Sequence, residues 1–546
     1  MASLSSKELV PQYGHIEIGD EELLPVCPQS DLENYFSDFR KNIIGHRQTF
    51  QSPFGEKQIV YADWTASGRA YGPIEAYIQK DILPFVANTH TATTITGSLM
   101  SKAYEAARVV IKTHVHADSD DALVFCGSGM TAAVNKLQRI LGLRLPERIT
   151  DYVQKAELHY SSLPGHDETN ANQPFRGILQ LDDVLRPVVF VTHMEHHSNQ
   201  VSWLETIATV EIIQPDVEGN VDLEYFSNLL EKFNHRKNKI AAITACSNVT
   251  GIQTPYHEIA RMIHACGGLC FVDFASSAPY VDINMHPKEK DMQLDAIYFS
   301  PHKFLGGPGT PGVLIFNKKI YKNSIPDQPG GGTVAYSNPW KVHEYIINIE
   351  QREDGGTPPF LQGIKAAMCV RLKERMGVEN MLKREAEILR LIFDRCSGIK
   401  DIEVLQGNIE ERLGVISFIV KGAHYDLIVK MLNDRFGIQA RGGCSCAGTY
   451  GHLLLGVDET RSYELLNLIH LGNELCKPGW IRLSVHPVMT NAEINFIMDA
   501  IESTVFHYRE WIKDYLYDPQ SNEFSFKERT ADEEGRIGEW FDTAAW

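Results

Sequence analysis

The sequence predicts an α/β protein with a large domain built on a mostly parallel sheet, followed by a smaller C-terminal α+β domain. Between residues 61 and 363, short apolar runs alternate with segments of helical periodicity, such as 131–141 and 256–266. That alternation is typical of a parallel sheet covered by helices. A long helical pattern over 362–397 leads to a second lobe, in which the apolar run 413–420 predicts a strand. A chain of 546 residues with 43% hydrophobic content can bury a large core in two lobes.

These patterns divide the chain into four parts. Residues 1–60 are expected to form an N-terminal arm, because the first thirty are acidic and punctuated by proline. Residues 61–363 are expected to form the large domain, 364–503 the small domain, and 504–546 an aromatic and acidic tail. Between about 145 and 186 the pattern breaks into a polar stretch, which we interpret as an insertion that serves as a lid or a dimer contact.

Composition excludes several classes of protein. A formal net charge of −18 argues against a broad nucleic-acid surface. No apolar run approaches the length of a membrane span, and the start of the chain lacks an apolar signal region, so we expect a cytoplasmic protein. The ten cysteines follow no regular framework, as expected of reduced thiols. Cys444 and Cys446 are too close together for a zinc knuckle, and no structural metal is expected.

Two residues at predicted strand ends carry the strongest chemical signal. Asp273 ends the apolar run 269–272, and Lys303 follows the run 295–299 within the sequence Ser-Pro-His-Lys. A lysine can hold pyridoxal 5'-phosphate as a Schiff base, and a carboxylate can keep the pyridine nitrogen protonated so that the ring acts as an electron sink. Strand-end aspartates and lysines are also common surface features, so the spacing alone leaves both interpretations open.

Three further polar motifs each follow an apolar run. They are Thr-His-Met-Glu-His-His-Ser-Asn at 192–199, Cys-Ser-Asn-Val-Thr-Gly at 246–251, and Gly-Ser-Gly-Met-Thr at 127–131. In this order, together with Asp273 and Lys303, they resemble the class V aminotransferase superfamily, most closely its cysteine desulfurase and selenocysteine lyase branch. The resemblance extends from about residue 61 to about 498, and it implies the fold type I of pyridoxal-phosphate enzymes.

The expected phosphate site lies where a glycine-rich turn meets a helix start. Free backbone N–H groups and the helix dipole favour an anion beside Met130 and Thr131, although Thr131 also suits a simple hydroxyl cap. The resemblance implies that Ser300 and His302 bind the same phosphate. Thr357 matches a phosphate contact donated by the neighbouring subunit, which implies a homodimer with shared active sites; the alternative is an ordinary turn residue.

The resemblance also implies contacts to the cofactor ring. His196 matches the imidazole that stacks on the ring and moves protons, two roles that suit a flat group titrating near neutral pH. His193 and His197 are alternatives within the same motif. Asn248 matches a residue that hydrogen-bonds the ring hydroxyl and so tunes the Schiff base. Ser276 is a departure, because close relatives place glutamine or histidine there, and the shorter side chain leaves the reaction subtype open.

Two residues match substrate-handling groups of the family. Arg482 matches the arginine that binds the substrate α-carboxylate as a bidentate fork, whereas a surface arginine in a strand is the plain alternative. Cys446, in the glycine-rich loop 439–448, matches the cysteine that attacks the substrate sulfur and keeps it as a persulfide. Cysteines are often small apolar fillers, but a polar loop is a poor place for one. Cys444 is an additional thiol that could relay sulfur, close a regulatory bond with Cys446, or do neither.

Together these residues predict a homodimeric enzyme acting on L-cysteine or a similar amino acid. Lys303 and His196 would exchange protons, Arg482 would anchor the substrate, and Cys446 would take sulfur or selenium and release alanine, with a sulfur-acceptor protein as a further partner. One alternative keeps the cofactor but performs C–S lysis, β-elimination or epimerisation without Cys446. The other is a sulfur-relay or interaction protein that retains the fold without turnover.

Overall fold

The computed structural model describes residues 30–149, 152, 155 and 182–543, apart from 88, 90, 92, 520, 521 and 529–532. Most of the predicted insertion and the first 29 residues of the predicted arm lie outside this part of the chain. Within it, no helix combines the length and the apolar character that a membrane span requires.

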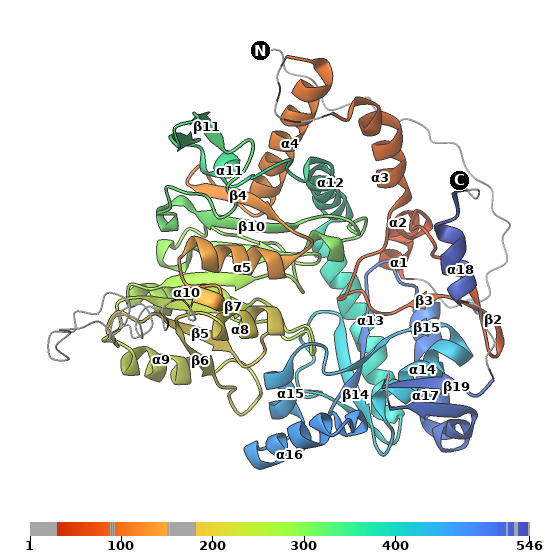
Figure 1. The fold of residues 1–546 in the computed structure, drawn as a ribbon. Helices are drawn as coiled ribbons and strands as arrows, with labels where there is room; N and C mark the ends of the chain where they lie inside the picture. Colours follow the sequence, from red (N-terminus) through yellow and green to blue (C-terminus); the bar gives the residue numbers. More distant parts are fainter. Residues whose placement is uncertain are drawn as a thin grey trace.

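A seven-stranded sheet forms the centre of the large domain (Figure 1). Its order is β4-β10-β9-β8-β7-β5-β6, and β10 alone runs antiparallel to its neighbours. The strands are β4 (Asp121–Cys126), β5 (Val188–Thr192), β6 (Thr209–Ile213), β7 (Lys239–Thr244), β8 (Leu269–Asp273), β9 (Ala296–Phe299) and β10 (Gly312–Asn317). Every residue of β4, β5, β7 and β9 is buried, which explains the continuous apolar runs in their sequences. The predicted α/β fold with a mostly parallel sheet is confirmed.

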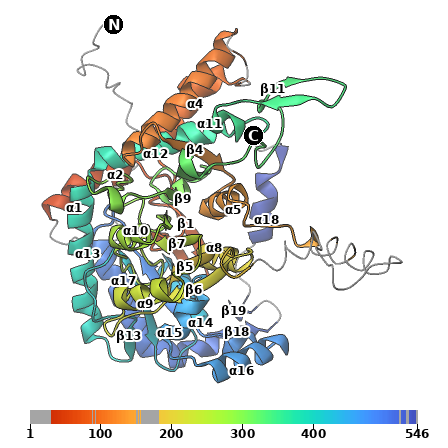
Figure 2. The same cartoon turned by 90° about the vertical axis from the view of Figure 1, so that its left-hand side faces the viewer.

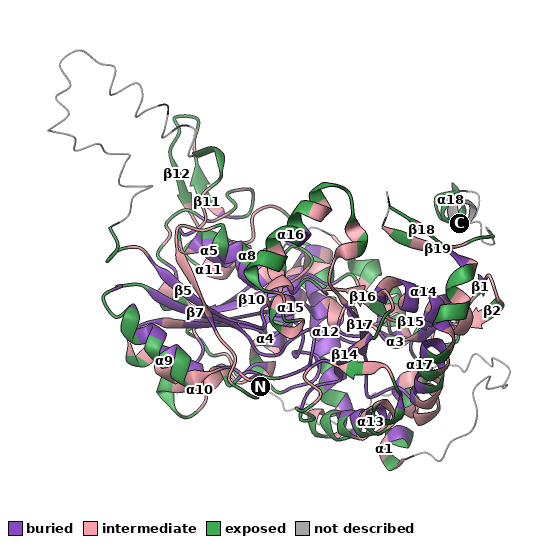
Figure 3. Cartoon of the chain, turned by 90° about the horizontal axis from the view of Figure 1, so that it is seen from below, coloured by how far each residue is buried: buried purple, intermediate pink, exposed green. Residues whose placement is uncertain are grey.

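Helices cover both faces of this sheet, and alternate side chains of each strand enter two separate hydrophobic cores. One core packs against α4 (Ile95–His114), α9 (Leu223–Lys232), α10 (Tyr256–Ala265) and α12 (Phe360–Met376). The other packs against α5 (Met130–Ile140) and α8 (His197–Leu204). Figure 2 shows the two helix layers on either side of the sheet, and Figure 3 shows the buried strands between helices with exposed outer sides.

The small domain is α+β, as the sequence predicts. Its antiparallel sheet has the order β13-β14-β17-β16, with strands β13 (Ile402–Val404), β14 (Val415–Val420), β16 (Arg441–Gly443) and β17 (Trp480–Ser484). Its helices are α13 (Val378–Gly398), α14 (Tyr425–Phe436), α15 (Gly448–Leu454), α16 (Glu459–His470) and α17 (Asn491–Trp511). A capping box between Thr490 and Glu493 starts α17, which continues past the predicted domain boundary at residue 503.

The prediction of a single bridging helix over 362–397 is wrong, because the structure contains two helices there. Gly377 separates α12 from α13 and has φ +77° and ψ 112°. A residue with a β-carbon rarely adopts this conformation, so the chain turns at the one glycine between the two periodic segments.

Residues 31–60, expected as part of the N-terminal arm, are folded against the rest of the chain. Phe36 and Phe39 are buried in the main core, and β3 (Val60–Tyr61) pairs in parallel with β15 (Ile438–Gln439). The remaining elements of this segment are α1 (Asp31–Tyr35), α2 (Ser37–Lys41), β1 (Thr49–Ser52) and β2 (Gly55–Gln58). Aromatic residues in an otherwise polar segment therefore attach this segment to the small domain.

Three peripheral features complete the described chain. The tail forms a hairpin of β18 (Tyr515–Asp518) and β19 (Glu523–Phe526) beside α14, followed by α18 (Glu533–Trp540). A second hairpin, β11 (Val334–Ser337) and β12 (His343–Tyr345), projects from the large domain (Figure 2). Two further short helices are α3 (Gly72–Tyr77) and α11 (Ile349–Arg352).

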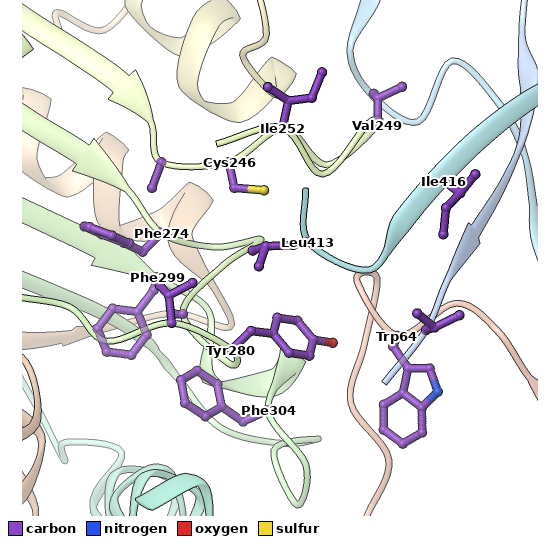
Figure 4. Packing of buried hydrophobic residues seen from close by; sticks show 14 of the residues in the cluster. Trp64, Cys246, Val249, Ile252, Phe274, Tyr280, Phe299, Phe304, Leu413 and Ile416 are labelled. Atoms are coloured by element: carbon purple, nitrogen blue, oxygen red, sulfur yellow. The ribbon is translucent and has the colours of Figure 1, made fainter. Parts of the chain in front are cut away.

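The two domains share a continuous core at the carboxyl ends of the parallel strands. Figure 4 shows Cys246 and Tyr280 of the large domain packed near Leu413 and Ile416 of the small domain, with Trp64 on the same side. Close packing of this kind resists small displacements. The strand ends and the small domain therefore form one closely packed platform.

Candidate active site

One cavity of about 300 Å³ lies on this platform. Side chains from the ends of separate strands meet there because the carboxyl ends of parallel strands share one edge of the sheet. The predicted site residues that line it are Met130, Thr131, His196, Asn248, Asp273, Ser276, Ser300, His302, Lys303, Cys446 and Arg482. The cavity thus brings together nearly all the residues selected from the sequence.

Asp273 and Lys303 are two ionisable groups that line the cavity. Asp273 is buried at the end of β8, its Oδ1 accepts a hydrogen bond from the Ala275 N–H at 2.8 Å, and burial raises its pKa to about 6. Lys303 ends the 3-10 turn Pro301–Lys303, where desolvation lowers its pKa to about 8 against the attraction of Asp273. A lowered pKa increases the fraction of neutral amine, the form that attacks a carbonyl carbon.

Hydroxyl and N–H groups converge at the start of α5. The Ser300 Oγ accepts a hydrogen bond from the Met130 N–H at 2.8 Å, and the Thr131 hydroxyl lies 2.7 Å from that of Ser198. The His302 Nδ1 lies 2.9 Å from a backbone carbonyl oxygen in the turn that precedes α5. The N-cap residue of α5 is Gly129, which has no side chain to cap the helix. Its N–H groups and these hydroxyls suit a phosphate group.

Of the three histidines in the 192–199 motif, His196 lines the cavity. It caps the start of α8 by accepting a hydrogen bond from the Ser198 N–H at 3.1 Å. Burial, and then the charge of Lys303, lower its pKa to about 3, so its imidazole is neutral. His193 is fully buried and packs against Tyr450 instead.

The side-chain amide of Asn248 makes a hydrogen bond through its nitrogen but not through its oxygen among the described residues. Its Nδ2 donates a hydrogen bond to the Ser445 carbonyl oxygen at 2.7 Å, whereas its buried Oδ1 has no partner among the described residues. A buried polar atom without a partner is costly. An orphaned amide oxygen, a buried carboxyl group and a nearby lysine therefore fit a polar ring bound in this cavity.

Arg482 is held by an aspartate that the sequence analysis missed. Its Nη2 lies 2.5 Å from Asp63 Oδ1, and its Nη1 donates to the Asn248 carbonyl oxygen at 3.3 Å. Asp63 Oδ2 also binds the Nε of Arg441 at 3.0 Å, and Arg441 and Arg482 are register partners in β16 and β17. One carboxylate thus separates two like charges and fixes both.

Cys446 lies on the loop between β16 and α15 and is exposed. It has φ +56° and follows Ser445 with φ +51°, two left-handed conformations in residues that carry a β-carbon. Cys444 is partly buried against the main core and does not line the cavity. Of the two thiols, Cys446 is therefore the one open to a bound substrate.

Ser276 and Thr357, both predicted to bind the cofactor, differ in their position relative to the cavity. Ser276 lines the cavity. Thr357 is exposed beyond α11 and is not part of the cavity lining. The expectation that Thr357 serves a neighbouring subunit stays a prediction.

The profile of the aminotransferase class-V family matches residues 186–497. The chain belongs to this family. Curated relatives of this class-V protein include a probable cysteine desulfurase of Halalkalibacterium halodurans, 26% identical over 71% of this chain and 84% of the relative. A cysteine desulfurase of Haloferax volcanii is 30% identical over 47% of this chain and 59% of the relative.

Solved structures share the class-V fold. The cysteine desulfurase of Thermococcus onnurineus NA1 aligns with a TM-score of 0.65 and 21% identity over 86% of this chain and 98% of that one. The Escherichia coli cysteine desulfurase CsdA aligns with a TM-score of 0.62 and 18% identity over the same shares. The predicted resemblance is confirmed, and this class-V protein is an enzyme of a family that in general uses pyridoxal phosphate.

Proposed function

We propose that this class-V enzyme is a cysteine desulfurase that removes sulfur, or selenium, from an L-cysteine-like substrate and releases alanine. The observation that carries the proposal is the exposed Cys446 in the wall of the cavity that also contains Lys303, Asp273 and Arg482. The names of the curated relatives support the same activity.

Bound pyridoxal phosphate supplies an electron sink for charge that develops at the substrate Cα. Lys303 would hold it covalently, Asp273 would pair with its ring nitrogen, and His196 would stack on the ring. Asn248 and Ser276 would face its ring hydroxyl. The phosphate would be held by Met130, Thr131, Ser300 and His302, and by Thr357 of a second subunit.

Each side chain of the cavity then has a separate role in the reaction. Arg482 binds the substrate carboxylate, with Asp63 holding the guanidinium in place. Lys303 and neutral His196 exchange protons with the substrate carbons. The Cys446 thiolate attacks the substrate sulfur. An S–S bond forms as the C–S bond breaks, the electron pair stays on carbon, and a proton turns that carbon into the methyl group of alanine.

The proposal extends to assembly and partners. The exposed position of Thr357 outside its own cavity supports a homodimer in which each subunit contributes to the other's phosphate site. The persulfide on Cys446 must pass to a thiol acceptor, which we propose is a cytoplasmic sulfur-acceptor protein.

With L-cysteine, cofactor and a reducing thiol, the purified protein should release alanine and sulfide in equal amounts. Alanine is measured by chromatography and sulfide by a colorimetric assay. A second candidate is a C–S lyase, favoured by the short Ser276 in the cavity lining, and it would give pyruvate and ammonia instead. Pyruvate without alanine would therefore replace the proposal with that candidate.

Arg482→Lys should raise the KM for L-cysteine about 10- to 100-fold, since a charge-assisted pair is worth roughly 1.5–3 kcal/mol. Lysine keeps the charge but not the fork. Arg441→Lys is the matched control, because Arg441 contacts the same aspartate but its side chain is 48% exposed, and its effect should be smaller. Equal turnover of cysteamine, which lacks the carboxylate, and L-cysteine by the wild type would rule out this role.

A further inference from the structure

The loop that carries Cys446 is tied to the first turn of α8 by one histidine. The His197 N–H donates a hydrogen bond to the Cys446 carbonyl oxygen at 2.7 Å. The His197 Nε2 in turn accepts a hydrogen bond from the Gly448 N–H at 2.8 Å. Backbone and side chain of a single residue therefore bind the loop on both sides of Ala447, directly after Cys446.

The chemistry of His197 suits this role. Burial lowers the pKa of its imidazole, which favours the neutral form. A neutral imidazole with its proton on Nδ1 leaves Nε2 free to accept from Gly448. A β-carbon at position 448 would lie 2.9 Å from Nε2, so the close approach requires the glycine that the sequence provides.

Two neighbouring contacts extend the same junction. The Thr449 hydroxyl donates to Gln200 Oε1 at 2.8 Å, and the Asn248 amide donates to the Ser445 carbonyl oxygen at 2.7 Å. These bonds hold a loop in which Ser445 and Cys446 both adopt left-handed backbone conformations. Such conformations persist only when surrounding contacts impose them.

We propose that His197 is a positioning residue that holds the Cys446 thiol over the cavity. The proposal rests on Cys446 as the sulfur acceptor. His196 lines the cavity and His197 holds the loop, so adjacent residues at the start of α8 place the proton-exchanging imidazole and the attacking thiol relative to each other. From the sequence, His197 is an alternative to His196 for stacking on the cofactor ring. In this proposal His197 has a different role, which is to position the loop.

His197→Ala removes the side-chain acceptor, and His197→Gln restores one through its amide oxygen. His197→Ala should lower kcat for alanine formation about tenfold, the size expected for one lost hydrogen bond, and leave the KM for L-cysteine within about twofold. His197→Gln should recover most of the loss. His452→Ala is the matched control, because His452 contacts the Gly448 carbonyl and Ser462 but not the Cys446 backbone, and it should change kcat little.

A second readout does not depend on turnover. Iodoacetamide should alkylate Cys446 several-fold faster in His197→Ala than in wild type or His197→Gln, with or without cofactor, because the freed loop lets the already exposed thiol turn away from the cavity wall and meet the reagent in more orientations. Tandem mass spectra distinguish Cys446 from Cys444. If no variant forms alanine but the alkylation contrast appears, the desulfurase proposal fails and the positioning role stands. Wild-type kcat and alkylation in His197→Ala, or no rescue by glutamine, would overturn the positioning role.

Discussion

Lys303→Ala should abolish turnover, with a loss of at least about a thousandfold, because one side chain supplies both the covalent bond to the cofactor and a proton-exchanging group. Borohydride reduction of the wild-type protein followed by peptide mass spectrometry should place the cofactor mass on Lys303. The variant should carry no such mass and should lack the visible absorption of the bound cofactor.

The environment of Lys303 also predicts how loading depends on pH. The neutral amine is the form that reacts, and desolvation lowers the pKa of Lys303 to about 8. Covalent loading of the apoprotein should therefore accelerate as pH rises toward 8 and level off above it. Lys365→Ala, which removes a lysine paired with Glu75, is a suitable control and should load as the wild type does. Cofactor mass on another lysine would refute the assignment.

The sequence predicts the large domain well because its strands are buried on both faces. Continuous apolar runs such as 188–191 and 240–243 correspond to β5 and β7. The break at Gly377 was missed because helical periodicity continues on both sides of a single residue with positive φ. The packing of residues 31–60 was missed because Phe36 acquires its significance only from a core made by distant segments.

The same distinction applies to the candidate site. Strand-end residues such as Asp273 and Lys303 could be predicted because the edge of a parallel sheet brings them together. Asp63 could not, since its partner Arg482 is 419 residues away and nothing local indicates the pair. His197 was visible in its motif, but its role depends on Gly448, which lies 251 residues further along the chain.

Cys446→Ser should reduce alanine formation by at least about a thousandfold while substrate still binds, since Arg482 and Lys303 remain. A serine hydroxyl has nearly the size of a thiol but does not ionise near neutral pH, so it cannot attack sulfur as a thiolate does. Alanine release measures the reaction, and the change in cofactor absorption on adding L-cysteine measures binding. Together the two measurements distinguish a variant that has lost only the attacking thiolate from one that no longer binds substrate.

Cys444→Ser is the matched control, because the second thiol lies two residues away, partly buried against the core and outside the cavity lining. If Cys444 is accessory, this variant should keep most of its alanine formation and most of its sulfur transfer to an acceptor thiol. If it relays sulfur, alanine should still form while transfer to an acceptor thiol stops. Wild-type alanine formation by Cys446→Ser would show that this thiol is not the sulfur acceptor. Pyruvate from both proteins would identify a lyase, because β-elimination expels the sulfur without any attacking thiol and leaves the cavity's lysine, histidine and arginine sufficient for the reaction.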